Sequence, residues 1–126
     1  MKEKRKKPSN PAPVIARFLD IWLGRKWEQL PDVLQITYAK TTSDSLPNTE
    51  RQLAGMPLAY VKVLRAIKVS PVIIDYHVEC DYADGRDSDV RVIRMVCESG
   101  VYDPDPCGNW GVNPISIYRV WEGEGA

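Results

Sequence analysis

Apolar and polar side chains alternate from residue 74 to residue 82, and this pattern is the strongest structural signal in the chain. The apolar positions are Ile74, Tyr76, Val78, Cys80 and Tyr82. Successive side chains of a strand point to opposite faces of a sheet, so the alternation predicts a half-buried β-strand. Asp84 and Gly85 follow where a tight turn is expected, because glycine adopts positive φ at no steric cost.

A second strand is predicted over residues 90–102, which are rich in valine and isoleucine. Its alternation is irregular, since Val90 and Val92 share one face whereas Ile93, Met95 and Cys97 share the other. Either a β-bulge near Val92 and Ile93 or burial of both faces explains this change. We expect the bulge, because a strand this long must bend around a small core. The two strands form a hairpin that needs further partners to be stable in water.

Helical periodicity precedes the strands. In residues 14–23 apolar side chains recur at helical spacing, and Gly24 is placed to end that helix. The recurrent positions are Ile15, Phe18, Leu19 and Trp22. Residues 25–40 show similar spacing around Pro31, which predicts either a short turn followed by a helix starting at Pro31 or one kinked helix. A short third helix is expected over residues 47–54.

Two further strands complete the predicted sheet, one over residues 57–70 and the last over residues 111–121. Pro114 lies near the start of the last strand and indicates an edge position or a bulge. Helices followed by strands predict an α+β fold, with the N-terminal helices packed on a strongly curved antiparallel four-stranded meander sheet. We expect one domain over residues 14–121, a disordered basic and proline-rich tail over 1–13, and a C-terminal tail over 122–126.

Composition and charge argue against a membrane-spanning protein and against a typical nucleic-acid-binding domain. The 126 residues are 44% hydrophobic and 27% charged, as in ordinary soluble domains, and no stretch is apolar enough for a membrane helix. Three cysteines without metal-ligand spacing favour a reducing, cytoplasmic setting. Residues 2–7 hold five bases and one acid, whereas the rest of the chain holds twelve bases and sixteen acids. We therefore expect contact with nucleic acid or membrane, if any, only through that basic tail.

The order of the predicted elements and two segments resemble a known superfamily. The segments are LDIWLGRKWEQL, at the end of the first helix, and NWGVNPISIYRV, in the last strand. Over residues 14–121 the chain resembles the nuclear-transport-factor-2-like superfamily, which has a cystatin-like cone fold. The resemblance implies a pocket between the helices and the concave sheet. Some relatives are isomerases, dehydratases or epoxide hydrolases, and many others only bind ligands or proteins.

The candidate site residues are those whose side chains we expect to point into such a cone. Ligand-binding positions are expected at Trp22, Tyr38, Tyr76, Arg91 and Met95. His77, the only histidine, shares the polar parity of its strand with Asp75 and Glu79, which predicts an exposed side chain and not a general base. We predict no catalytic residue and no cofactor, since the sequence has no glycine-rich phosphate loop or nucleophile elbow. We also predict no metal site, since the aspartates near the hairpin turn match no calcium loop.

These features favour a non-enzymatic binding or assembly module that presents a cone pocket or a sheet face to a protein partner or a small apolar ligand. Outward-pointing Val90, Val92 and Val96 predict an apolar sheet face suited to a homodimer. The alternative is a small cofactor-free isomerase, dehydratase or cyclase that acts on a hydrophobic substrate. Its polar groups would be the tyrosines and the arginine of the expected pocket.

Overall fold

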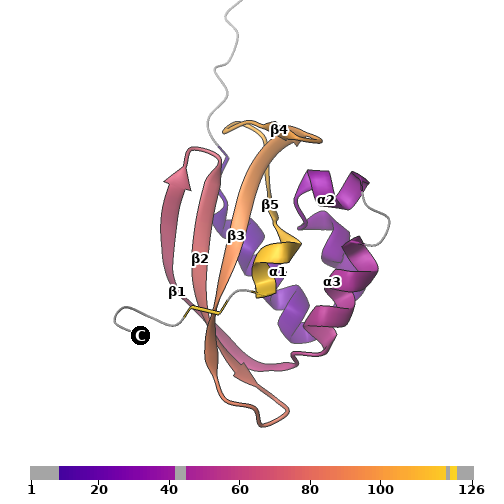
Figure 1. Cartoon of the computed structure of the whole chain (residues 1–126), viewed down its shortest axis with the longest axis vertical. Helices are drawn as coiled ribbons and strands as arrows, with labels where there is room; N and C mark the ends of the chain where they lie inside the picture. Colours follow the sequence, from indigo (N-terminus) through magenta and orange to yellow (C-terminus); the bar gives the residue numbers. More distant parts are fainter. Residues whose placement is uncertain (1–8, 42–44, 119, 122–126) are drawn as a thin grey trace, which may run out of the picture.

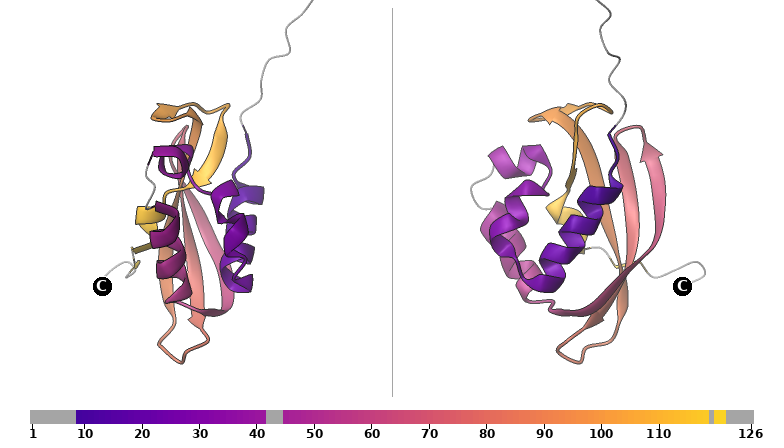
Figure 2. Two further views of the ribbon diagram at one scale, coloured as in Figure 1. Left: turned by 90° about the vertical axis from the view of Figure 1, so that its right-hand side faces the viewer. Right: turned by 180° about the vertical axis from the view of Figure 1, so that it is seen from behind.

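Helices and a sheet pack against each other in the computed structural model of residues 9–41, 45–118 and 120–121. The sheet is mostly antiparallel, which confirms the predicted α+β class (Figure 1). Helix α1 crosses one face of the sheet, as the reverse view in Figure 2 shows, and α2 and α3 stand beside it. The elements in chain order are α1 Ala12–Gly24, η1 Trp27–Asp32, α2 Ile36–Thr41, α3 Ser45–Ala54, β1 Leu58–Ser70, β2 Ile73–Tyr82, β3 Asp89–Gly100, β4 Asp103–Pro104, β5 Asn109–Val112 and η2 Pro114–Tyr118, where η denotes a 3-10 helix.

The first helix, α1, forms because its apolar residues recur on one face. The buried ones include the predicted Ile15, Phe18, Leu19 and Trp22. Pro13 in the first turn removes no helical hydrogen bond, because the first amides of a helix have no partner within it. At the other end Arg25, and not the predicted Gly24, takes the left-handed conformation that closes the helix (φ 56°).

The segment after α1 differs from both predicted alternatives. Pro31 lies inside the 3-10 helix η1, and Val33 ends that helix. Leu34 then forms an isolated parallel bridge with Val112 of β5 before α2 begins. In this bridge the Gln35 amide donates to the Val112 oxygen (2.9 Å) and the Val112 amide donates to the Val33 oxygen (2.7 Å). This strand-like connection covers the β5 edge of the sheet.

Close packing of that connection depends on Gly111 in β5. A Cβ atom at Gly111 would lie 2.5 Å from the Cα atom and the amide nitrogen of Gln35, nearer than nonbonded atoms approach. Glycine therefore lets the two backbones meet where any other residue would hold them apart.

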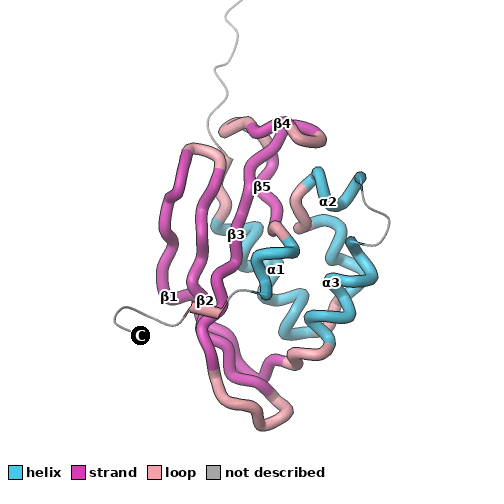
Figure 3. The backbone as a smooth tube through the Cα atoms, viewed as in Figure 1, coloured by secondary structure: helices cyan, strands magenta, loops and turns pink. Residues whose placement is uncertain are grey.

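The sheet runs in the order β1-β2-β3, with β5 and the short β4 both paired to β3 (Figure 3). This is the predicted meander, with the two-residue β4 added before β5. Pairing of β2 with β3 is unbroken over residues 89–96, so the β-bulge expected near Val92 and Ile93 is wrong. Both residues are buried instead, one on each face of the sheet.

The outer face of the sheet, opposite the core, is covered near His77 by the end of the described chain. The Trp121 amide donates to the Val90 oxygen (2.7 Å), and the Trp121 ring centre lies 5.2 Å from that of His77. His77 is 6% exposed, and Val92, its partner across the strands, is 4% exposed. Val96 is buried as well. The exposed histidine and the exposed valine face are therefore wrong, while a homodimer as such stays a prediction.

The last predicted strand is interrupted. After β5 the chain forms η2, and Val120 then pairs with Arg91 of β3 in an isolated bridge. Pro114 has no amide hydrogen to donate and so cannot continue the ladder. The Arg94 amide instead donates to the Ser116 hydroxyl (2.9 Å), which keeps η2 attached to β3.

Much of the two predicted tails, residues 1–8 and 122–126, lies outside the described residues. The residues just before α1 are held in place by the loop that leads into β5. Ser9 Oγ donates to the Gly108 oxygen (2.6 Å), and the Trp110 ring nitrogen donates to the Ser9 oxygen (2.9 Å). The packed domain therefore begins before the predicted boundary at residue 14.

Candidate functional site

The five residues predicted to bind a ligand do not share one pocket. Three of them are buried in the core, namely Trp22, Tyr76 and Met95. The ring nitrogen of Trp22 already donates to the Met56 oxygen (2.9 Å). Tyr38 lines a pocket on the outer face, and Arg91 belongs to a polar cluster at the end of the β2–β3 hairpin. Ligand binding by these residues stays a prediction.

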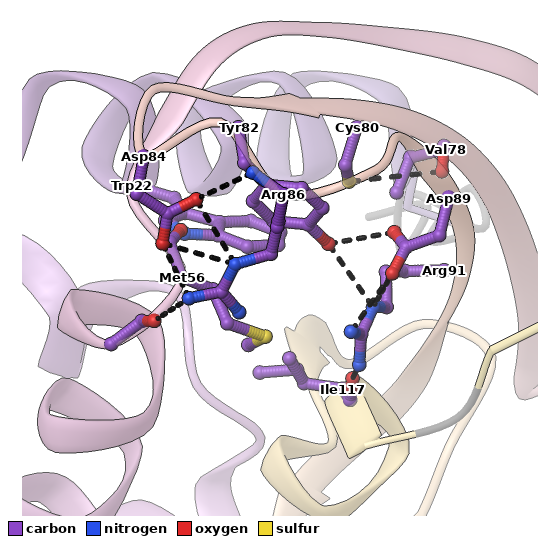
Figure 4. Close-up of polar contacts among 11 residues, drawn as sticks. Trp22, Met56, Val78, Cys80, Tyr82, Asp84, Arg86, Asp89, Arg91 and Ile117 are labelled. Atoms are coloured by element: carbon purple, nitrogen blue, oxygen red, sulfur yellow. Dashed lines mark hydrogen bonds and ion pairs between the residues drawn. The ribbon is translucent and has the colours of Figure 1, made fainter.

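The polar cluster joins the end of β2 to the start of β3 and consists of Tyr82, Asp89 and Arg91 (Figure 4). Tyr82 Oη donates to Asp89 Oδ1 (2.6 Å), and Arg91 Nη2 donates to Asp89 Oδ2 (2.9 Å). Arg91 Nε donates to Tyr82 Oη (3.2 Å), and Nη1 donates to the Ile117 oxygen of η2 (3.2 Å). We call these three side chains the hairpin cluster. Because each polar group binds the next, the cluster holds β2, β3 and η2 together.

Arg86, in the loop between β2 and β3, stacks on the ring of Tyr82 (Figure 4). Its guanidinium carbon lies 5.1 Å from the ring centre, and its Nη2 donates to the Gly55 oxygen (2.7 Å). Asp84 accepts from Arg86 Nε at 3.0 Å, and hydrogen bonding by Arg86 lowers the pKa of the Asp84 carboxyl. The hairpin loop is thereby attached to the turn that follows α3.

Burial suppresses ionisation near the hairpin cluster. It raises the pKa of Tyr82 above the ordinary value of 10.0, and the hydrogen bond to Asp89 raises that pKa further. Burial also raises the pKa of the neighbouring Cys80 thiol from 9.0 to about 12. Both groups are protonated at neutral pH, so neither the phenol nor the thiol supplies a base or a nucleophile there.

The hairpin cluster is best explained as a structural joint. Its donors and acceptors are bound to one another, whereas a catalytic group must reach a proton or an atom of the substrate. In the described part of the chain, no group of three or more histidine, cysteine or acidic side chains could hold a metal ion. Two other features bear on function, a pocket on the outer face and an edge of the sheet.

A pocket of about 250 Å³ lies on the outer face, between α2, β3 and the chain before and after β5. We call it the outer pocket. Its lining residues are Gln35, Thr37, Tyr38, Ile73, Arg94, Val96, Tyr102 and Asn113. Ile73 and Val96 lie opposite each other in β2 and β3 and give it an apolar part. Amide, hydroxyl and guanidinium groups supply the rest of the lining.

Two buried carboxylates fix the side chains around the outer pocket. Glu98 accepts from the amide (3.0 Å) and the hydroxyl (2.7 Å) of Thr37, which anchors the first turn of α2 to β3. Asp75 accepts from Arg94 Nε (2.8 Å) and Nη2 (3.0 Å) in a bidentate ion pair. That hydrogen bonding raises the pKa of Arg94, so the charge of Arg94 is permanent but already balanced.

Gln35, a residue that lines the outer pocket, has a buried side-chain oxygen without a hydrogen-bond partner among the described residues. The residue is 8% exposed, and its Oε1 has no hydrogen-bond partner among the described residues. Leaving a buried polar atom in this state costs about 1–3 kcal/mol. Buried polar atoms of native proteins are usually satisfied by protein groups or ordered water, so Gln35 Oε1 is an exception among the described residues.

Among the described residues, strand β1 is a free edge of the sheet (Figure 3). It pairs with β2 on one side, whereas the opposite edge, at β5, is covered by residues 33–35. Five large apolar side chains of β1 are exposed, namely Tyr60, Val63, Leu64, Ile67 and Val69. The strand also exposes Lys62, Arg65 and Lys68 and contains no acidic residue. We call this surface the β1 edge.

Sequence reasoning does not identify Tyr82 and Asp89 as partners of Arg91, although a signal exists. Asp89 shares the parity of Arg91, so both side chains emerge on one face of β3. The β1 edge and the unpaired Gln35 have no comparable signal, because both depend on which distant segments cover them.

Comparison of the chain with models of known families, with curated proteins and with solved structures finds no match. The superfamily resemblance drawn from the sequence therefore stays a prediction. No helix in residues 9–41 or 45–118 is long and apolar enough to cross a membrane. Function is accordingly inferred from the geometry of the described residues.

Proposed function

We propose that this protein is a non-enzymatic binding module whose β1 edge receives an extended segment of a partner protein. One observation carries the proposal, namely that the long outermost strand exposes large apolar side chains. An edge strand presents a row of backbone donors and acceptors that another strand can pair with. Several large apolar side chains exposed together on one strand support a binding surface.

The geometry of β1 limits how a partner can bind. Three shifts of register against β2 bend the strand and leave two regular runs, residues 60–63 and residues 65–68. Each run can accept a short strand through backbone hydrogen bonds. The side chains of the partner would then alternate between the two faces of the sheet.

The charge of β1 identifies the chemistry of the partner. Lys62, Arg65 and Lys68 give the edge three positive charges and no negative one. A partner strand that alternates acidic and apolar residues would complement both the charges and the apolar side chains. A second copy of β1 fits less well, because antiparallel pairing would bring two sets of cations together without any acid.

A binding measurement with defined peptides tests the proposal. The probe is a short, fluorescently labelled peptide of alternating glutamate and valine, and the control peptide has lysine in place of glutamate. We expect fluorescence anisotropy to show saturable binding of the acidic peptide alone. Ile67→Lys places a charge on the β1 edge and should weaken that binding by about tenfold or more.

Ile115→Lys is the matched control, because Ile115 is also exposed but lies on η2. It should bind the acidic peptide like the wild type. Equal affinity for both peptides, or equal loss in the two variants, would refute binding at the β1 edge. A concentration-dependent dimer in sedimentation, abolished by Ile67→Lys alone, would replace the acidic partner with a second copy of the chain.

A further inference from the structure

A second pocket, of about 460 Å³, lies between the start of α1, the segment from η1 to α2, and β5. We call it the helix pocket, and it shares no lining residue with the outer pocket. Its volume falls within the roughly 300–1,000 Å³ of pockets that bind small ligands. The helix pocket is therefore large enough for a small organic molecule, and its lining indicates which kind.

Apolar side chains from several elements form one part of the lining. Leu34 and Trp110 belong to the buried core, and Val14 and Ala39 pack against it. The Trp110 ring is fixed in place, since its nitrogen donates to the Ser9 oxygen (2.9 Å). A ligand with an apolar body would therefore meet a preformed apolar surface. The apolar lining residues are Val14, Pro31, Leu34, Ile36, Ala39 and Trp110.

The charged side chains of the lining, Asp32 and Lys40, leave one positive charge unbalanced. The Asp32 carboxylate is already paired, because Arg17 Nη2 lies 2.9 Å from its Oδ2. Lys40 is exposed and forms no ion pair among the described residues. Its flexible four-carbon stem lets the ammonium group reach an occupant of the pocket. An anionic group on the occupant would gain an ion pair that the described chain alone does not make.

The N-terminus of α1 adds to this positive potential, independently of Lys40. Asn10 and Val14, on either side of the helix start, both line the pocket, and the first turn of α1 contains no acidic residue. The N-terminal end of a helix carries a partial positive charge that favours a nearby anion and disfavours a cation. Both features therefore select an occupant of the same charge.

One unbalanced cation beside an apolar lining suits a ligand with a single negative charge and an apolar body. A cation would be repelled by Lys40 and by the start of α1, and a wholly apolar molecule would leave both without a partner. We propose that the helix pocket binds a small apolar monocarboxylate, whose carboxylate pairs with Lys40 while its apolar body lies against Trp110 and Leu34.

A matched set of small molecules tests the charge requirement. The probe is 4-phenylbutyrate, with 4-phenylbutanamide as its neutral analogue and 4-phenylbutylamine as its cationic one. We would titrate each into the isotopically labelled full chain at neutral pH and follow amide resonances by NMR. The carboxylate should shift the amides of residues 32–40 and 108–110, and the indole N–H of Trp110, in a saturable way. The neutral amide should bind about threefold or more weakly, and the amine more weakly still.

Two variants locate the site. Lys40→Met removes the charge and keeps an unbranched side chain, so it should weaken 4-phenylbutyrate about threefold or more and leave 4-phenylbutanamide unaffected. Lys68→Met, the same change at an exposed lysine of β1, is the control and should bind like the wild type. Ala39→Phe places a ring in the lining and should weaken both ligands. If Ala39→Phe does not fold, the exposed Lys40→Met still tests the site.

Several results would overturn the proposal. They are equal affinity for 4-phenylbutyrate and its amide, undiminished affinity in Lys40→Met, saturable shifts confined to other parts of the protein, and no shift at all. The measurement does not depend on peptide binding at the β1 edge, so either proposal can fail while the other holds.

Discussion

The hydroxyl of Tyr82 donates a 2.6 Å hydrogen bond to the carboxylate of Asp89, which ties the last residue of β2 to the first residue of β3. Arg91 binds both groups and extends the contact to η2 through the Ile117 oxygen. The 3-10 helix η2 and the hairpin are thus held by one set of polar contacts. Removal of any of these three side chains should therefore lower the free energy of unfolding.

Tyr82→Phe should lower the free energy of unfolding by about 1–2 kcal/mol, because it removes the hydroxyl and leaves part of the Asp89 carboxylate unpaired. Urea denaturation followed by circular dichroism measures the change. Tyr60→Phe is the control, since Tyr60 is half exposed on β1, and its stability should match the wild type. An unchanged midpoint for Tyr82→Phe would show that the hairpin cluster does not stabilise the fold.

Stability should fall as the pH rises above about 9. Burial raises the pKa of Cys80 from 9.0 to about 12 and raises those of Tyr76 and Tyr82 above 10.0. Between these values the unfolded chain releases protons that the folded chain keeps, so the free energy of unfolding decreases with pH. Below pH 9 both states are protonated and these groups have no effect. Urea midpoints from pH 7.5 to 10.5 measure the slope.

Cys80→Ala is the matched variant for that experiment. Of these three groups it removes the one with the lowest pKa in the unfolded chain, so its stability should fall less steeply with pH than that of the wild type, whatever its stability at pH 7.5. Parallel curves for the two proteins would mean that the buried thiol ionises normally in the folded state.

Gly111→Ala should destabilise the fold much more than Gly100→Ala. The new Cβ at position 111 would meet the backbone of Gln35 at 2.5 Å, whereas at position 100 it would meet nothing within 4 Å. We expect a loss of about 1–3 kcal/mol for the first variant, as for other overpacked sites, and little for the second. Thermal unfolding measures both, and equal midpoints would contradict the pairing of residues 33–35 with β5.

Val92→Glu should unfold the protein and not merely separate a dimer. Val92 is 4% exposed, so the glutamate would place an unpaired charge in a covered site at a cost of several kcal/mol. Val63→Glu makes the same change on the exposed β1 edge and should leave a folded chain. A folded, soluble Val92→Glu variant would mean that the outer face is not covered in solution.

Local sequence patterns predicted the elements that are set by contacts between residues close in the chain. Alternation identified β2, because its inward side chains are apolar and its outward ones polar. Helical spacing identified α1 for the same reason. The α+β class followed from the order of these elements. In each case the decisive contacts lie within the element or with its nearest neighbour in the chain.

Features that depend on distant segments could not be predicted. Residues 33–35 read as helical, yet they pair with β5, which lies far along the chain and accepts them only because residue 111 is glycine. His77 reads as exposed, yet Trp121 returns to cover it. The β1 edge and the unpaired Gln35 are likewise set by which segments come to lie nearby. The candidate binding surfaces therefore became visible only in the folded chain.

Amide hydrogen exchange of β1 tests the central proposal most directly. In the free protein, the β1 amides that point away from β2 should exchange fast, because no strand of the described residues pairs with them. Saturating alternating glutamate–valine peptide should slow exchange at those amides within residues 60–63 and 65–68, and leave β5 unchanged. Unchanged exchange in β1 despite bound peptide would contradict strand pairing at this edge.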